Sequence, residues 1–222
     1  MQPYIILLLV VVLAASVAAF CVMGLRQRRR RRVLQEAAAE MGLEFSATDM
    51  HDLPLRFKDL VLIGSGHSRL AYNIASGRIG RWQARVFDFH YEVGHGVRRS
   101  TRYYSAAIVE LADSLEPVLM WHEQDLPDAP LAARGGDGRV GAWTYVGGEA
   151  TAHALARACA PLADVAVSMQ LRRDVLLLCC PARRHPNAHA RLMACLSDVL
   201  TSLTDREPTG PTGAWPRVPS AG

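Results

Sequence analysis

The feature that most constrains this chain is an uncharged apolar run of 21 residues, 4–24, near the N-terminus. At about 1.5 Å per residue, a helix of this length spans roughly 31 Å, the thickness of a bilayer core. A cleaved signal peptide would carry basic residues before the apolar run and a small-residue cleavage site after it. In this chain the basic residues follow the run. The pattern therefore predicts a retained transmembrane anchor over residues 1–25.

A dense arginine cluster follows the apolar run and predicts the orientation of the chain. Because Lys and Arg stay on the cytoplasmic side, we expect the N-terminus outside and residues 33–222 in the cytosol. A role as topology signal is sufficient to explain the cluster, and each arginine near the surface can also attract anionic lipid headgroups by about 1 kcal/mol. Residues 26–42 are expected to form a juxtamembrane segment and a helical stalk. The residues assigned to topology and lipid headgroups are Arg26, Arg28, Arg29, Arg30, Arg31 and Arg32.

The charge outside this cluster is slightly acidic. The whole chain has a net charge of +4, but residues 33–222 hold 19 basic and 21 acidic residues, a net of −2. This balance argues against a nucleic-acid partner. Arg outnumbers Lys 24 to 1, a bias typical of GC-rich bacterial genomes, so the expected location is the bacterial inner membrane. The five cysteines are an odd number and include an adjacent pair, which favours reduced, buried thiols over a disulfide framework.

The remaining sequence predicts an α+β fold, with a mainly antiparallel sheet and two or three helices packed on one face. Strands are expected at residues 60–63, 69–74, 81–93, 101–111, 115–122, 140–146, 165–171 and 175–180, with turns at Gly77 and Gly80. Composition indicates a helix at 149–159, and helical spacing of apolar residues indicates one at 187–203. The domain is expected over residues 43–204, with a division into two lobes near 124–138 left open. Residues 205–222 contain four Pro and three Gly, which predicts a disordered tail.

One predicted strand carries Asp88, His90 and Glu92 on a single face, opposite the aromatic residues. A carboxylate–imidazole–carboxylate set could bind a metal or a small ligand, or perform acid–base chemistry. The simpler interpretation is the solvent face of an amphipathic strand. Arginines on the returning strand are expected to pair with these carboxylates across the hairpin, and the candidates are Arg98, Arg99 and Arg102.

A second cluster has the residue types of a zinc site: Cys179, Cys180, His185 and His189. The two cysteines end an apolar run, and the cluster contains no C-x-x-C pair. We therefore interpret them as core residues and keep the metal site as an alternative. The chain shows no nucleophile motif and no phosphate-binding loop in the required context. We expect no catalytic residues, no cofactor and no metal.

The stretch Tyr72-Asn73-Ile74-x-x-Gly77 and, after it, Val86-Phe87-Asp88-Phe89-x-Tyr91-x-x-Gly94-x-Gly96 resembles a loose set of uncharacterised bacterial proteins. These proteins have a single membrane-spanning N-terminal helix and a small cytosolic α+β domain. The likeness covers about a quarter of the chain. It implies the same architecture and no site residues.

These observations favour a membrane-anchored cytosolic domain that acts as a non-enzymatic protein-interaction or scaffold module. Its expected partners are the lipid bilayer, through residues 4–24, and a protein of unspecified identity. One alternative is a small-ligand sensor or hydrolytic enzyme that uses Asp88, His90 and Glu92. Another is a metal-binding domain built on the cysteine–histidine cluster.

Overall fold

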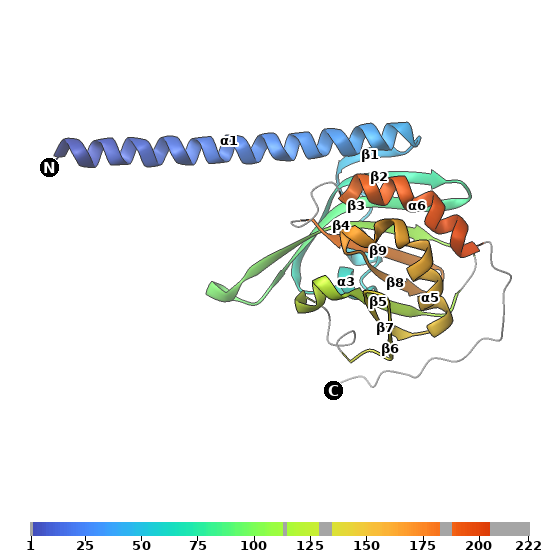
Figure 1. Ribbon diagram of the computed structural model, residues 1–222. Helices are drawn as coiled ribbons and strands as arrows, with labels where there is room; N and C mark the ends of the chain where they lie inside the picture. The colour runs from blue at the N-terminus through green and yellow to red at the C-terminus, as the bar shows by residue number, and fades with distance from the viewer. Residues whose placement is uncertain (1, 113–114, 129–134, 183–187, 205–222) are drawn as a thin grey trace.

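The computed structural model describes residues 2–112, 115–128, 135–182 and 188–204. Its N-terminal part is one long helix, α1 (Gln2–Glu40). Figure 1 shows it projecting far beyond the rest of the protein. Its large apolar side chains between Tyr4 and Leu25 are exposed, and by length and composition the helix could cross a membrane. The helix continues without a break through the arginine cluster.

A nine-stranded antiparallel sheet forms the body of the described domain. Its strand order is β1-β2-β3-β4-β9-β8-β5-β7-β6, so strands from both sides of residues 124–138 join one sheet. The predicted α+β class with a mainly antiparallel sheet is confirmed. The strands are β1 (Glu44–Thr48), β2 (His67–Ile79), β3 (Trp82–Val93), β4 (Ser100–Glu110), β5 (Val118–His122), β6 (Gly138–Val140), β7 (Trp143–Gly147), β8 (Ser168–Arg172) and β9 (Val175–Pro181).

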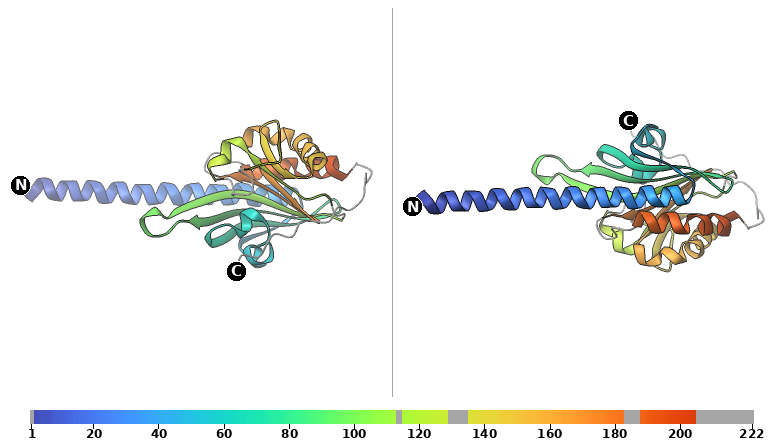
Figure 2. Two further views of the ribbon diagram at one scale, coloured as in Figure 1. Left: turned by 90° about the horizontal axis from the view of Figure 1, so that it is seen from below. Right: turned by 90° about the horizontal axis from the view of Figure 1, so that it is seen from above.

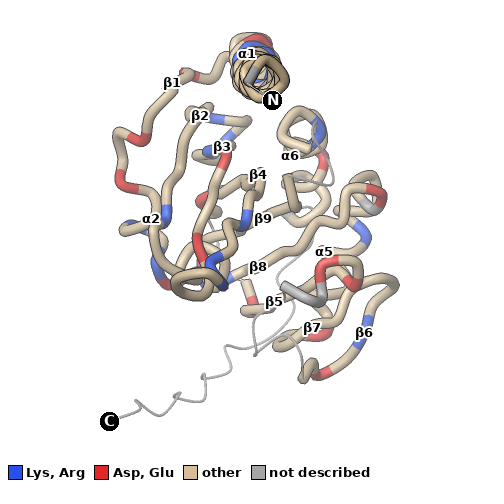
Figure 3. Tube along the Cα trace, turned by 90° about the vertical axis from the view of Figure 1, so that its left-hand side faces the viewer, with Lys and Arg blue, Asp and Glu red and all other residues tan. Residues whose placement is uncertain are grey.

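Helices cover both faces of the sheet. The C-terminal part of α1 lies on one face with α5 (Glu149–Ala158) and α6 (Ala188–Thr204), as the end-on view in Figure 3 shows. The short helices α2 (Leu53–Arg56) and α3 (Val61–Gly64) pack against the other face. The prediction of helices on one face only is therefore wrong. Three 3₁₀ turns complete the described elements: η1 (Gly96–Arg98), η2 (Glu123–Asp128) and η3 (Ala160–Val165).

The predicted strand at residues 60–63 is wrong, because this segment forms α3. It lies on top of the sheet instead of within it. A helical turn lets the adjacent side chains of Leu62 and Ile63 both enter the core beneath, whereas a strand would point them in opposite directions. The Val61 N–H is at the start of the helix and has no acceptor within it, so it donates to Gln170 Oε1 at 2.7 Å.

Two further details differ from the expected strands. Gly77 lies inside β2, where a Cβ would come within 2.9 Å of the Leu43 side chain, so its small size serves packing against the start of β1 and not a turn. The single strand expected over residues 140–146 is a hairpin, with a turn at Gly141, where φ is +58°, between β6 and β7.

Candidate functional site

The candidate site lies where α1 crosses the face of β3. Alternation along β3 places Phe87 and Phe89 in the core under α2 and α3, as the sequence predicts. It places Asp88 and Glu92 on the opposite face, where the prediction of a solvent-exposed row is wrong. Asp88 is fully buried under Arg30 of α1, and Glu92 is 7% exposed beside Arg99 and His67. The sheet therefore has a buried carboxylate on β3, the third strand from one edge.

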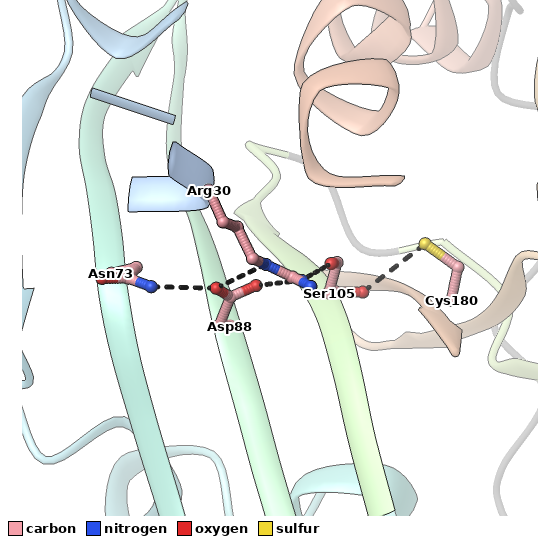
Figure 4. A network of polar contacts seen from close by, with 5 residues as sticks. All are labelled: Arg30, Asn73, Asp88, Ser105 and Cys180. Atoms are coloured by element: carbon pink, nitrogen blue, oxygen red, sulfur yellow. Dashed lines mark hydrogen bonds and ion pairs between the residues drawn. The ribbon is translucent and has the colours of Figure 1, made fainter. Parts of the chain in front are cut away.

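An arginine from the cluster binds this buried carboxylate. Arg30 Nε donates to Asp88 Oδ2 at 3.0 Å, and Nη2 donates to Oδ1 at 2.6 Å, a two-pronged contact (Figure 4). The same Nη2 donates to the Ser105 hydroxyl at 2.9 Å. The side chain of Arg30 is 24% exposed and that of Asp88 is not exposed at all. Planar guanidinium groups suit this geometry, which a lysine would not reproduce.

The neighbouring strands complete the hydrogen bonding of Asp88. Asn73 Nδ2 donates to Asp88 Oδ2 at 3.0 Å. Asn73 lies in a β-bulge of β2 and has φ of +50°, a left-handed conformation that asparagine tolerates better than most residues. Ser105 of β4 is directly opposite Asp88, and Cys180 of β9 is directly opposite Ser105. The polar row thus crosses four strands, β2, β3, β4 and β9, beneath α1 and α6 (Figure 4).

Apolar contacts extend the docking of α1 toward its C-terminal end. Leu34 and Ala38 are fully buried. They follow Arg30 at steps of four residues, so all three lie on one helix face. On the neighbouring face, the Arg31 guanidinium lies 5.7 Å from the centre of the Phe45 ring. The expected stalk is thus a helix packed on the sheet, where ion pair, apolar contact and cation–π contact act together.

Burial around this contact favours the uncharged forms of two neighbouring side chains. Burial lowers the pKa of His189, at the start of α6; the charge of Asp88 raises it and that of Arg30 lowers it. Neither ring nitrogen of His189 has a hydrogen-bond partner within the described part of the chain. Burial and then the charge of Asp88 raise the pKa of Tyr72 to about 12. Arg30 is the basic partner of the buried Asp88 carboxylate here.

The arginine cluster divides into inward and outward residues. Arg30 and Arg31 contact the domain. Arg28, Arg29 and Arg32 are exposed, and their assignment to lipid headgroups stays a prediction. The side chain of Arg26 lies outside the described residues. The spacing of Arg30, Leu34 and Ala38 is the sequence signal that could have indicated a docked face, and only the structure shows which carboxylate this face meets.

Glu92 has its own partners at the far end of β3. It forms an ion pair with Arg99, one of the three predicted cross-hairpin arginines, and lies 3.8 Å from His67. Burial tends to raise its pKa, but hydrogen bonds from Ser68 and Arg99 and the charge of His67 outweigh burial, so the pKa is lowered. Asp88 and Glu92 are thus engaged by separate basic residues. This arrangement does not favour shared acid–base chemistry.

The cysteine–histidine cluster is not brought together. Cys179 and Cys180 occupy successive positions of β9 and belong to opposite cores of the sheet. His189 lies on the Cys180 side, and His185 lies outside the described residues. The described residues hold no group of three or more His, Cys, Asp or Glu side chains that could bind a metal. The alternating direction of strand side chains separates the two thiols.

Comparison with models of protein families gives no match, and comparison with curated proteins gives none either. Among solved structures, the chain is similar to the crystal structure of the mycobacterial trehalose monomycolate transport factor A, TtfA. The TM-score is 0.52 and the sequence identity is 17%, over 83% of this chain and 99% of that chain. At this identity the likeness concerns the fold. It includes nearly the whole of the TtfA structure.

Proposed function

We propose that this chain is a single-pass protein of the bacterial inner membrane whose cytosolic domain is a non-enzymatic interaction or scaffold module. Residues 4–24 span the bilayer, the N-terminus lies outside, and the exposed arginines remain at the cytosolic surface. The domain holds a protein partner at a set height and orientation above the membrane. Its likeness in fold to a transport factor supports a role as an accessory factor in a membrane transport process.

The observation that carries this proposal is the buried contact between Arg30 and Asp88. A tethered enzyme needs only a flexible linker, whereas this domain is locked to its helix by two hydrogen bonds to a fully buried carboxylate. Both oxygens of that carboxylate are engaged, and Asn73 adds a third hydrogen bond. The buried Asp88 carboxylate therefore fixes the helix to the domain, which suits a scaffold better than a hydrolytic site.

Topology is tested by protease treatment of sealed inside-out and right-side-out membrane vesicles that contain the tagged full chain. Carbonate washing first establishes whether the protein is integral. The proposal predicts that the domain is digested only in inside-out vesicles. Digestion in right-side-out vesicles would contradict the orientation, and release by carbonate would contradict the anchor.

The scaffold role is tested by cross-linking in native membranes, mild detergent extraction and mass spectrometry of co-purifying proteins. The full chain is compared with a chain that lacks residues 33–222 and with the Arg30→Gln variant. We expect a stoichiometric membrane-protein partner that is absent from the truncated chain and reduced in Arg30→Gln, where the domain remains but its orientation is released. Equal recovery from the full and truncated chains would contradict the proposal.

A further inference from the structure

The β3–β4 hairpin projects from the domain toward the N-terminal half of α1. Figure 1 and both views of Figure 2 show the tip of the hairpin extending beyond the body of the sheet on this side. We define the hairpin tip as residues 92–102, which connect the ends of β3 and β4 through η1. If the apolar part of α1 lies in a bilayer, the tip points at the surface of that bilayer.

The contact between Arg30 and Asp88 sets the level of the hairpin relative to the helix. From Arg30 back to Leu25, the last apolar residue before the cluster, is five residues of helix, or about 7.5 Å. From Asp88 forward to Val93 is five residues of strand, or about 16 Å. A strand inclined by as much as about 60° to the helix axis would therefore still reach the level of Leu25. The hairpin is long enough to touch the membrane.

The tip has the composition of a membrane-surface contact. Val97 is fully exposed at its end, although it is a large apolar residue in a turn. Arg98 and Arg99 follow it, and both are exposed. With Arg69 at the adjacent start of β2 and Arg102, four arginines stand against one acidic residue, Glu92. Residues 92–102 alone have a net charge of +2, and Arg69 raises it to +3, whereas residues 33–222 as a whole have a net charge of −2.

Specific contacts fix the conformation of the turn at the tip. Gly94 has φ of +76°, and a Cβ there would come within 2.6 Å of the Arg98 carbonyl oxygen. The His95 ring stacks on His67 of β2 at 5.1 Å between centroids. Arg99 is held by its ion pair with Glu92. These contacts present Val97 and Arg98 outward in a set direction, which lowers the entropic cost of binding a surface.

We infer that the hairpin tip is a second membrane contact, in which Val97 enters the interface and the surrounding arginines bind anionic lipid headgroups. This inference rests on the proposed membrane anchor. Together, α1 and the tip would hold the domain at two points, so that it could neither rotate about the helix nor tilt freely. Exposed basic side chains are attracted to anionic lipid surfaces over about a Debye length, and an apolar side chain at their centre adds insertion.

The test uses the full chain with Val97→Trp, reconstituted in vesicles whose acyl chains carry bromine, which quenches nearby tryptophan fluorescence. One set contains phosphatidylcholine alone and the other contains 30% phosphatidylglycerol. The matched control is Arg81→Trp, an exposed position in the turn at the opposite end of β3. The quenching of the unsubstituted chain is subtracted from that of each variant, which removes the contribution of the native tryptophans.

We expect at least twofold more excess quenching for Val97→Trp than for Arg81→Trp in anionic vesicles, and a smaller difference without anionic lipid. Adding Arg98→Ser should reduce the quenching, and adding Arg78→Ser at the far turn should not. Equal quenching at positions 97 and 81 in anionic vesicles would overturn the inference, and so would quenching independent of anionic lipid. Carbonate washing of the same vesicles tests the anchor separately. A retained protein without quenching contradicts the hairpin contact alone, and a released protein contradicts the proposed function.

Discussion

Removal of the Arg30 guanidinium should destabilise the domain far more than removal of any exposed arginine beside it. Arg30→Gln deletes two hydrogen bonds to Asp88 and one to Ser105. It leaves a fully buried carboxylate with only Asn73 as a described hydrogen-bond donor. Breaking a buried ion pair in this way costs about 3–5 kcal/mol. Because Arg30 keeps 24% of its side chain exposed, we expect the lower half of this range.

The relative stabilities of the single and double variants distinguish the loss of a buried ion pair from a simple loss of packing. Asp88→Asn leaves Arg30 unpaired, but this side chain can turn toward water, so a cost of about 1–3 kcal/mol is expected. The double variant Arg30→Gln/Asp88→Asn removes both charges and places two amides in contact. It should therefore be more stable than Arg30→Gln alone, although it carries one more substitution.

The assay is thermal unfolding of the full chain in a non-ionic detergent, followed by the fluorescence of the buried tryptophans. One kcal/mol corresponds to about 2–4 °C for a chain of this size, so Arg30→Gln should lower the melting temperature by about 6–16 °C. The control is Arg29→Gln, at an exposed position, which should change it by less than about 2 °C. Equal effects at positions 29 and 30, or a double variant no more stable than Arg30→Gln, would refute the reasoning.

Three other predictions follow from single groups. Burial lowers the pKa of His189, so its contribution to stability is full above the unfolded value of about 6.5 and is lost as pH falls toward the folded value. His189→Leu should therefore reduce the loss of thermal stability between pH 7.5 and 5.5, and exposed His153→Gln should not. Burial raises the pKa of Cys159 to about 12, so iodoacetamide should alkylate it, as measured by mass spectrometry, only after unfolding. Gly66→Ala would bring a Cβ against the Glu92 carbonyl oxygen and should cost more than about 2 kcal/mol in denaturant unfolding, whereas Gly96→Ala, with the same left-handed φ and open space, should cost about 1.

Local periodicity is sufficient to predict most of the sheet and α6, and composition predicts α5. The alternation around Phe87 and Phe89 marks β3, and the apolar spacing after residue 187 marks α6. These patterns work because side-chain direction repeats every two residues in a strand and every 3.6 in a helix. Residues 60–63 failed because four consecutive apolar residues suit a buried strand and a buried helical turn equally.

The docking of α1 could not be predicted in the same way. Polar residues at alternate positions of a strand indicate only that this face differs from the other, so the simpler prediction places Asp88 in solvent. Its burial depends on Arg30, 58 residues earlier in the chain. The arginine cluster also has an independent explanation as a topology signal. One arginine that pairs inward therefore cannot be recognised among its neighbours without the three-dimensional contact.

The most direct test of the account is the chemical reactivity of the arginines in the full-length protein. In non-ionic detergent without anionic lipid, a dicarbonyl reagent modifies accessible guanidinium groups, and mass spectrometry with fragmentation locates each modification. The account predicts that Arg30 reacts several times more slowly than Arg28, Arg29 and Arg32, and that Asp88→Asn brings its rate close to theirs. Modification of Arg30 as fast as Arg29 in the unsubstituted chain would show that the helix is not docked on the sheet, and would contradict a scaffold whose domain is fixed to its membrane anchor.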